Sequence, residues 1–355
     1  MMSNEIIVTI GPSSIKEDIL KNLILAGADI FRVNLSHSTK NSLEYYFDVL
    51  EKVGIVPAID TQGPQLRVIE IFLPKTLQKN DTLIISFDNL KIKEKQTPNI
   101  CLNHPEASSQ IEKGDVLKID FNGLAILISD KIDEKNFIGK VIANGDVFIN
   151  RAVDIKNKPI ELNVLTQFDK YAIDYAYKRG CRNFYCSFVS SSEDIKQIRN
   201  ILPAGTKLIS KVETSKSLNN IEEIILNSDS LLIDRGDLSR EISIPLVPIA
   251  VDKVLKISKT YKKDIYIATN ILDSMMKAKV PSRAEISDLY NLLSKGVKGI
   301  VLAAEVAIGK NPVESVSLVK YMMQIHKKQS NGLLGVGELS KPDKYLVGEE
   351  LYQWL

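Results

Sequence analysis

The chain has 355 residues, of which 44% are hydrophobic and 25% are charged, the composition of a globular protein with a large core. Lysine and arginine number 46 against 44 acidic residues, so the net charge of +2 gives no reason to expect a nucleic acid or an anionic membrane as partner. The N-terminus has no basic segment leading into an apolar stretch, and no run of about 18 apolar residues occurs. We therefore expect a cytoplasmic protein without nucleic-acid or membrane partners.

Short apolar runs alternate with longer segments of helical period along most of the chain, a pattern typical of a parallel sheet. Eight strand-and-helix units close into a barrel more readily than they form an open sheet. We therefore predict an α/β fold, a (β/α)8 TIM barrel. The expected strands are Ile6–Gly11, Ile30–Ser36, Val56–Thr61, Asn183–Val189, Lys207–Glu213, Ser230–Gly236, Ile265–Asn270 and Gly299–Ala304.

A long insertion interrupts this alternation after the third strand, because about a hundred residues precede the next helix, far more than a loop contains. Strand-like runs such as Thr82–Phe87, Val116–Phe121 and Leu124–Ile128 predict a small all-β module in it, placed over the barrel mouth. The expected organisation is a barrel of residues 1–65 and 165–329, an inserted β lid domain of residues 66–164 between strand 3 and helix 3, and a C-terminal tail of residues 330–355.

Polar side chains gather at the C-terminal ends of the predicted strands, where barrels of this kind carry their active sites. Lys211 and Glu213 share a parity on the fifth strand, so both can face one side of the sheet. Glu213 and Asp237, from neighbouring strands, offer hard oxygen ligands suited to Mg²⁺ or Mn²⁺. Lys211 beside them should stay charged and stabilise developing negative charge. The other candidates at strand ends are Arg32, Asn34, Ser36, His37, Asp60, Thr61, Asp234, Arg235, Gly236, Thr269, Asn270 and Glu305.

The sequence Arg235-Gly236-Asp237 adds a candidate anion site. Gly236 has no side chain, so neighbouring backbone N–H groups can approach a carboxylate or phosphate closely. An adhesion role for these three residues is not expected in a cytoplasmic protein.

Ordered segments run through the whole predicted barrel: TIGPSS at 9–14, FRVNLSHS at 31–38, DTQGPQLR at 60–67, ISKVE at 209–213, RGDL at 235–238, ATNILDSM at 268–275, PSRAEISD at 281–288 and AAEVAIGKNP at 303–312. Together they resemble the pyruvate kinase family over about residues 5 to 328. The inserted β module then corresponds to the mobile lid domain of that family, and the family's C-terminal effector domain is not expected in this chain.

The resemblance implies roles for individual residues. Glu213 and Asp237 would bind the divalent cation, Arg32 and Lys211 the phosphoryl group, and Thr269 would assist proton transfer at the enolate carbon. The implied catalytic residues are therefore Lys211, Thr269 and Arg32. The implied substrate-binding residues are Arg32, Arg67, Lys211, Asp234, Arg235, Gly236, Asp237 and Thr269, and K⁺ as a further cofactor would be bound by Asn34, Ser36, Asp60 and Thr61.

Some positions depart from the family pattern. Phe168 stands where the family has a lysine that contacts nucleotide phosphates, and Asp234 stands in place of an alanine. Gln62 and Gln65 replace a lysine and a glutamate in the segment linked to K⁺ dependence. These changes fall on the nucleotide side of the site and around the substrate carboxylate.

Three functions therefore remain open from the sequence. The first is a pyruvate kinase-like phosphotransferase that moves phosphoryl between phosphoenolpyruvate and a nucleoside diphosphate, with pyruvate as product and ADP or ATP as nucleotide. The second is a metal-dependent lyase, aldolase or other enolpyruvate or oxo-acid enzyme that uses no nucleotide. The third is a non-catalytic pyruvate kinase homologue. In each case we expect a homo-oligomer, a dimer or a tetramer.

Overall fold

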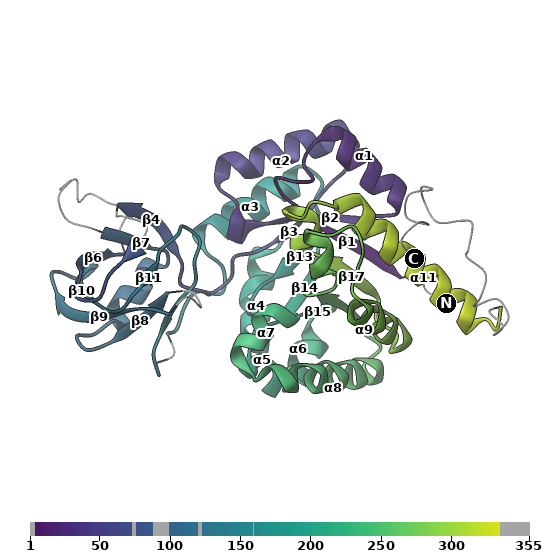
Figure 1. The fold of residues 1–355 in the computed structure, drawn as a ribbon. Coiled ribbons are helices and arrows are strands. Elements are labelled where there is room, and N and C mark those ends of the chain that lie inside the picture. Colours follow the sequence, from purple (N-terminus) through teal and green to yellow (C-terminus); the bar gives the residue numbers. More distant parts are fainter. Residues whose placement is uncertain (1–3, 73–75, 88–98, 120–122, 159, 334–355) are drawn as a thin grey trace. The chain divides into compact units, whose positions relative to one another are not determined.

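The computed structural model describes residues 4–72, 76–87, 99–119, 123–158 and 160–333. The chain divides into two compact units, of which the first joins Met1–Thr61 to Gln167–Leu355 and the second is Gln62–Thr166 (Figure 1). Residues 334–355 of the predicted tail, and Phe121 at the end of a predicted strand, lie outside the described residues. None of the described helices combines the length and the apolar character needed to span a membrane.

Parallel strands of the first unit close into a barrel in the order β1-β17-β16-β15-β14-β13-β3-β2. Each strand pairs with the next barrel strand along the chain, and β1 also pairs with β17 to close the ring. The predicted (β/α)8 fold class is confirmed. The barrel strands are β1 (Glu5–Ile10), β2 (Ile30–Asn34), β3 (Ala58–Asp60), β13 (Asn183–Cys186), β14 (Lys207–Val212), β15 (Ser230–Asp234), β16 (Asp264–Ala268) and β17 (Gly299–Leu302).

Buried side chains fill the interior of the barrel below the predicted site. They come from all the barrel strands except β2, on which Ile30 packs against them. Burying each large apolar side chain contributes roughly 1.5–3 kcal/mol, so this layer fixes the strands whose ends carry the polar residues. The members of the layer are Ile7, Ala58, Tyr185, Ile209, Leu232, Tyr266, Ala268 and Val301.

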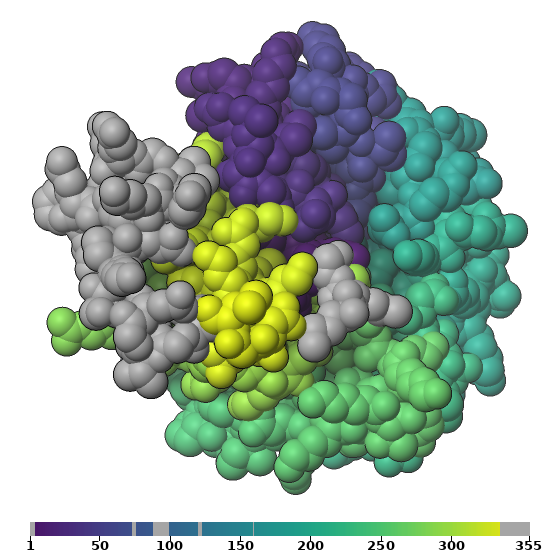
Figure 2. All heavy atoms as spheres, turned by 90° about the vertical axis from the view of Figure 1, so that its right-hand side faces the viewer, coloured from purple at the N-terminus to yellow at the C-terminus, as the bar shows by residue number. Residues whose placement is uncertain are grey.

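Helices cover the outside of the barrel (Figure 1). Local signals set their ends: Gly27 ends α1 in the left-handed conformation at φ 103°, and Ser282 and Glu285 form a capping box at the start of α9. The first and last helices, α1 and α11, pack side by side (Figures 1 and 2). The α-helices are α1 (Glu17–Ala26), α2 (Lys40–Lys52), α3 (Gln167–Lys178), α4 (Ser192–Ile201), α5 (Ser215–Asn219), α6 (Ile221–Asn227), α7 (Arg235–Glu241), α8 (Val247–Thr260), α9 (Arg283–Ser294), α10 (Ala304–Ala307) and α11 (Pro312–Ser330). The 3-10 helices of this unit are η1 (Leu35–His37), η3 (Ile244–Leu246) and η4 (Asp273–Met276).

The second unit is built mainly from β-strands around its own apolar core. Its large sheet has the order β12-β8-β9-β10-β6-β7-β4, and β11 pairs with β5. Alternate residues of β9 are buried, as expected for a strand with one face on a core. The strands are β4 (Val68–Phe72), β5 (Thr76–Leu77), β6 (Thr82–Ser86), β7 (Asn99–Leu102), β8 (Val116–Ile119), β9 (Leu124–Lys131), β10 (Asn136–Ala143), β11 (Gly145–Asp146) and β12 (Val153–Ile155), with one 3-10 helix, η2 (Pro105–Gln110).

Several barrel strands end earlier than the sequence suggested. β2 ends at Asn34 and β15 at Asp234, whereas the predicted strands ran two residues further. In both cases the side chain of the last strand residue accepts a backbone N–H just beyond it, from Ser36 and from Asp237. This local hydrogen bond starts a helical turn in place of further strand. Ser36, Gly236 and Asp237 therefore lie in tight turns beyond the paired strands.

Candidate active site

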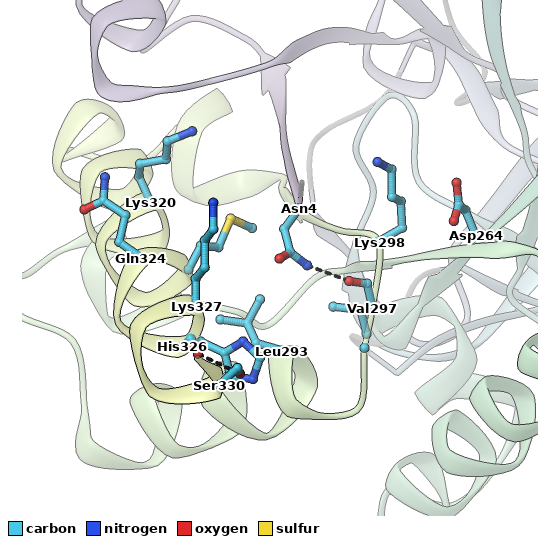
Figure 3. Close-up of a pocket in the computed structure, with 12 residues that line it drawn as sticks. Asn4, Asp264, Leu293, Val297, Lys298, Lys320, Gln324, His326, Lys327 and Ser330 are labelled. Atoms are coloured by element: carbon cyan, nitrogen blue, oxygen red, sulfur yellow. Dashed lines mark hydrogen bonds between the residues drawn. The ribbon is translucent and has the colours of Figure 1, made fainter. Parts of the chain in front are cut away.

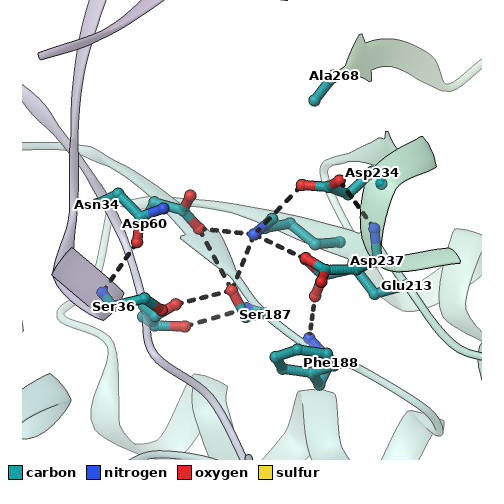
Figure 4. A network of polar contacts seen from close by, with 12 residues as sticks. Asn34, Ser36, Asp60, Ser187, Phe188, Glu213, Asp234, Asp237 and Ala268 are labelled. Carbon is teal, nitrogen blue, oxygen red and sulfur yellow. Dashed lines mark hydrogen bonds and ion pairs between the residues drawn. The ribbon is translucent and has the colours of Figure 1, made fainter. Parts of the chain in front are cut away.

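Lys211 lies at the centre of a buried polar network at the C-terminal ends of the strands (Figure 4). Its Nζ is 2.8 Å from Glu213 Oε1 and 3.1 Å from Asp60 Oδ1, and it donates a hydrogen bond to Ser187 Oγ at 3.0 Å. Burial alone would lower the pKa of Lys211, but the carboxylates of Asp60, Glu213 and Asp234 outweigh burial and raise it. The side chain therefore stays an ammonium, as predicted. The contact between Lys211 and Glu213 confirms that both side chains face the same side of the sheet.

Asp60 bridges Lys211 to a second buried cation. Arg32 Nη1 lies 2.9 Å from Asp60 Oδ2, and the Arg32 side chain is only 2% exposed. Its Nε and Nη2 donate to Thr9 Oγ1 at 3.2 and 2.8 Å, and its guanidinium carbon lies 5.6 Å from the centre of the Tyr185 ring. The sequence reasoning did not select Thr9. Its position opposite Arg32 in the register of β1 and β2 is the structural signal that identifies it.

The end of β13 supplies two further contacts that the sequence reasoning missed. Ser187 Oγ lies 2.7 Å from Thr61 O and 3.3 Å from Asp60 Oδ1, in addition to its bond from Lys211. The backbone N–H of Phe188 donates to Glu213 Oε2 at 2.6 Å, and Phe188 has a φ of 56°. A polar residue directly after a buried strand was the available sequence signal for Ser187.

Three carboxylates converge beside Lys211. One ligand oxygen each from Glu213, Asp234 and Asp237 lies within 4.8 Å of the others. Burial raises the pKa of Glu213 to about 8, although the Lys211 ammonium acts in the opposite direction. Asp237 Oδ1 is also paired with Arg240 Nη1 at 2.9 Å. Hard oxygen donors with excess negative charge in a buried space fit a divalent cation such as Mg²⁺ or Mn²⁺.

Thr269 connects this cluster to the turn that starts α7. Its Oγ1 lies 3.0 Å from Asp234 Oδ1 and 2.6 Å from Ala268 O, and it accepts the backbone N–H of Gly236 at 2.7 Å. The backbone N–H of Asp237 points to Asp234 Oδ1 at 3.4 Å. The N–H groups that the sequence suggested for an anion are thus directed at side chains of the protein itself. Thr269 has a φ of 66°, a rare conformation for a β-branched residue and typical of functional sites.

Arg235 and Glu305 hold the loop after β16 in place. The Arg235 guanidinium donates to Thr269 O at 2.9 and 3.2 Å, to Asn270 O at 2.8 Å and to Asp288 at 2.6 Å. Glu305 is 1% exposed and accepts three backbone N–H groups, from Ile271, Leu272 and Ala303. Burial raises the pKa of Glu305. Both side chains therefore act on the backbone that positions Thr269.

Three of the residues expected to bind K⁺, Asn34, Ser36 and Asp60, lie on the opposite side of the network from Glu213, Asp234 and Asp237 (Figure 4). Asn34 Oδ1 accepts the backbone N–H of Ser36 at 2.9 Å, and Thr61 Oγ1 accepts the backbone N–H of Ser187 at 3.0 Å. Each Asp60 oxygen already faces a cation of the protein, Lys211 or Arg32. Asp60 is the only carboxylate among the four residues expected to bind K⁺, and Lys211 and Arg32 already neutralise it.

Arg67 and Phe168 are two further predicted features, and each has its own local contacts. Arg67 belongs to the second unit, where its Nη1 donates to Asn150 O at 2.9 Å, so its place in the active site stays a prediction. Phe168 lies in the first turn of α3 and stacks on Tyr171 at 6.5 Å between ring centres. Lys40 Nζ lies 4.7 Å from the centre of the Tyr171 ring. An aromatic pair therefore occupies the position where the resemblance implied a lysine.

A pocket of about 490 Å³ lies at the opposite end of the barrel, beside α11 (Figure 3). Asn4 before β1, Asp264 at the start of β16 and Lys298 before β17 line it together with Lys320 and Lys327 of α11. No residue of the predicted site lines this pocket. It is therefore separate from the network around Lys211.

Known proteins match this chain along most of its length. Residues 1–316 match the family model described as pyruvate kinase, barrel domain. Pyruvate kinase of Methanocaldococcus jannaschii is 30% identical over 329 residues, which are 92% of this chain and 70% of that protein. Pyruvate kinase of Thermotoga maritima is 29% identical over 340 residues, 93% of this chain and 72% of that protein. For the enzyme of Methylorubrum extorquens the values are 27% identity, 88% of this chain and 66% of that protein, so this chain spans about two thirds of its relative's length.

The fold comparison agrees with the sequence matches. The crystal structure of Cryptosporidium parvum pyruvate kinase superposes with a TM-score of 0.80 and covers 92% of this chain and 71% of that chain. At 23% identity this likeness shows the shared fold alone. The family model and the relative from Methanocaldococcus jannaschii show the family. The chain belongs to the pyruvate kinase family.

Proposed function

We propose that this chain is a metal-dependent phosphotransferase that moves a phosphoryl group between phosphoenolpyruvate and a nucleoside diphosphate and yields pyruvate. The observation that carries the proposal is the Lys211 ammonium, buried between Asp60 and Glu213 and next to three carboxylates. Phosphoryl transfer requires little covalent chemistry from a protein, and depends on fixed positive charge and accurate positioning. Family membership supports the same reaction.

Glu213 and Asp237 are the proposed ligands of the divalent cation, Mg²⁺ or Mn²⁺. When bound, the cation supplies Lewis-acid neutralisation of phosphoryl oxygens. Glu213 is fixed for this role by the backbone N–H of Phe188 and by Lys211, so its carboxylate cannot rotate freely.

Lys211, Arg32 and Thr269 are the proposed catalytic residues. Lys211 holds a positive charge at the phosphoryl group, and its raised pKa keeps that charge in place. Arg32 is fixed by Asp60 and Thr9, and its remaining N–H groups are the donors that we assign to the phosphoryl oxygens. Thr269 holds its hydroxyl next to Asp234 Oδ1, and we assign it to proton transfer at the enolate carbon. The substrate-binding roles of Arg67, Asp234, Arg235, Gly236 and Asp237 stay predictions.

One observation is compatible with a different function, that of a nucleotide-free lyase or aldolase. Phe168 stacks on Tyr171 where a lysine for nucleotide phosphates was expected. The relatives described above are all pyruvate kinases, so this alternative and that of a non-catalytic homologue are not favoured.

Pyruvate formation from phosphoenolpyruvate and Mg²⁺, measured with and without ADP, separates these functions. We expect pyruvate only when a nucleoside diphosphate is present, and a loss of that activity in Lys211→Met. Pyruvate formed without nucleotide would contradict phosphotransfer and support the lyase. No pyruvate under either condition, with all components confirmed by a control enzyme, would support a non-catalytic homologue.

Two further assignments are proposals about the whole protein. We expect a homo-oligomer, dimer or tetramer, because Ile244, Leu246 and Ile249 are 74%, 49% and 52% exposed on η3 and the start of α8. Light scattering after size-exclusion chromatography tests this, and a monomer would contradict it. The cytoplasmic location stays a prediction from the N-terminal sequence.

A further inference from the structure

We infer that Asp234 is a third carboxylate ligand of the divalent cation, beside Glu213 and Asp237. The inference rests on the proposed metal-dependent function and concerns the same site. Asp234 is the last residue of β15 and is 6% exposed, so its carboxylate is almost completely enclosed. A buried carboxylate is costly unless it has compensating partners, which makes its surroundings informative.

The two oxygens of Asp234 have different surroundings. Oδ1 lies 3.0 Å from Thr269 Oγ1 and 3.4 Å from the backbone nitrogen of Asp237. Oδ2 lies 4.0 Å from Lys211 Nζ, which is longer than a hydrogen bond, and no other described residue is seen to donate to it. One oxygen therefore fixes the side chain, and the other faces Lys211 and the neighbouring carboxylates (Figure 4).

The spacing of the three carboxylates suits one ion. Ligand oxygens of Glu213, Asp234 and Asp237 lie within 4.8 Å of one another. A cation with oxygen ligands at about 2.0–2.6 Å places ligands on opposite sides of it about 4–5 Å apart. Small side-chain movements therefore bring all three groups into one coordination sphere. Asp234 and Asp237 belong to the same capped turn, which holds their relative positions.

The charges lead to the same conclusion. Asp60, Glu213 and Asp234 face the Lys211 ammonium, and Arg240 contacts Asp237. Lys211 contacts Glu213 at 2.8 Å but lies 4.0 Å from Asp234, so the buried Asp234 carboxylate has the weaker compensation within the chain, and a divalent cation supplies it. The site should therefore bind its cation before any substrate is present. An anionic group of the substrate then meets the cation and Lys211, since Thr269 Oγ1 and the Asp237 N–H are already directed at Asp234.

Titration of the substrate-free protein with Mn²⁺, followed by calorimetry and by the electron paramagnetic resonance signal of free Mn²⁺, tests the inference. Asp234→Asn keeps an oxygen for Thr269 and for the Asp237 N–H, and removes the charge and the strong ligand. We expect the Mn²⁺ affinity of Asp234→Asn to fall by at least about tenfold, since even groups that only orient metal ligands are worth about 10–100-fold. Asp229→Asn is the matched control. Asp229 directly precedes the same strand at the other end of the barrel and accepts the N–H of Leu208, so its variant should bind Mn²⁺ like wild type.

Wild-type Mn²⁺ affinity in Asp234→Asn would overturn the inference, because a purely capping role survives that substitution. Thermal unfolding in excess EDTA checks that Asp234→Asn is folded. We expect a cooperative transition at a temperature near that of wild type. If Asp234→Asn does not fold, Asp234→Ala replaces it, since alanine also removes the charge and the ligand oxygens; a fall in Mn²⁺ affinity supports the inference, whereas wild-type affinity overturns it. The result is independent of turnover: weakened Mn²⁺ binding in a protein that makes no pyruvate would refute the proposed function and leave this inference standing.

Discussion

Replacement of Lys211 by methionine should destabilise the barrel strongly. Above about pH 8, where Glu213 is ionised, the separations of 2.8, 3.1 and 4.0 Å from Glu213, Asp60 and Asp234 correspond to attractions of about 6, 5 and 4 kcal/mol at an effective dielectric constant of about 20. The desolvation of the ammonium and the repulsion among the carboxylates offset most of this attraction. The net loss on removing one member of such a buried ionic group is about 3–5 kcal/mol, because the remaining charges lose their compensation. Since the pKa of Lys211 is raised, its charge is fully present below about pH 10, the pKa of lysine in the unfolded chain, and on the alkaline side the contribution is lost as the pH rises through the higher folded value. On the acid side, the part that comes from Glu213 falls as this group protonates below about pH 8.

Urea denaturation in EDTA, followed by circular dichroism at the helix band, measures this loss. The described α-helices all belong to the barrel unit, so the signal reports on that unit. The double variant Lys211→Met with Asp60→Asn should be less destabilised than the sum of the single variants, because it removes a carboxylate that the first change leaves unpaired. Lys295→Met is the control: Lys295 pairs with Asp252 at the surface, both side chains 43% exposed, and its loss should cost less than about 1 kcal/mol. A free energy of unfolding for Lys211→Met within about 1 kcal/mol of wild type would refute the electrostatic reasoning.

Three other predictions concern the chemistry of the site. Glu213→Gln should abolish tight Mn²⁺ binding in calorimetry, because Glu213 is the most deeply buried carboxylate of the cluster, and unchanged affinity would remove it from the metal site. Thr269→Val should slow exchange of the pyruvate methyl protons with solvent, seen by NMR, by about 100-fold or more, whereas Thr269→Ser keeps the hydroxyl and should exchange readily; equal rates in both variants would exclude the hydroxyl from proton transfer. Replacing K⁺ by tetramethylammonium should leave most of the phosphotransfer activity, because Lys211 and Arg32 already neutralise Asp60, and a complete loss of activity would show that K⁺ is required.

The barrel strands were predictable because their apolar runs are short, regularly spaced and buried on both faces. The parity of Lys211 and Glu213 was predictable for a similar reason, since alternation along a strand fixes the side from which each side chain leaves. The same reasoning placed the strand ends too late. It did not weigh the side-chain oxygens of Asn34 and Asp234, which accept N–H groups from the following turn and end the pairing.

Contacts between strands were beyond the sequence reasoning. Thr9 and Ser187 became visible as partners of Arg32 and Lys211 only when the register between strands was known. The surroundings of Asp234 are a second case, because the sequence could not tell whether its carboxylate faces a substrate, Thr269 or a cation. That difference depends on how the first turn of α7 is capped, where Asp234 Oδ1 accepts the N–H of Asp237.

A phosphorus NMR time course with phosphoenolpyruvate, ADP and Mg²⁺ tests the central claim most directly. We predict that the signal of phosphoenolpyruvate decays while the γ-phosphate of ATP grows in equal amount, with pyruvate formed in the same proportion. The decay should stop when ADP is omitted or Lys211 is replaced by methionine. Release of inorganic phosphate, or consumption of phosphoenolpyruvate without ADP, would contradict the assignment of this site to phosphoryl transfer between phosphoenolpyruvate and a nucleoside diphosphate.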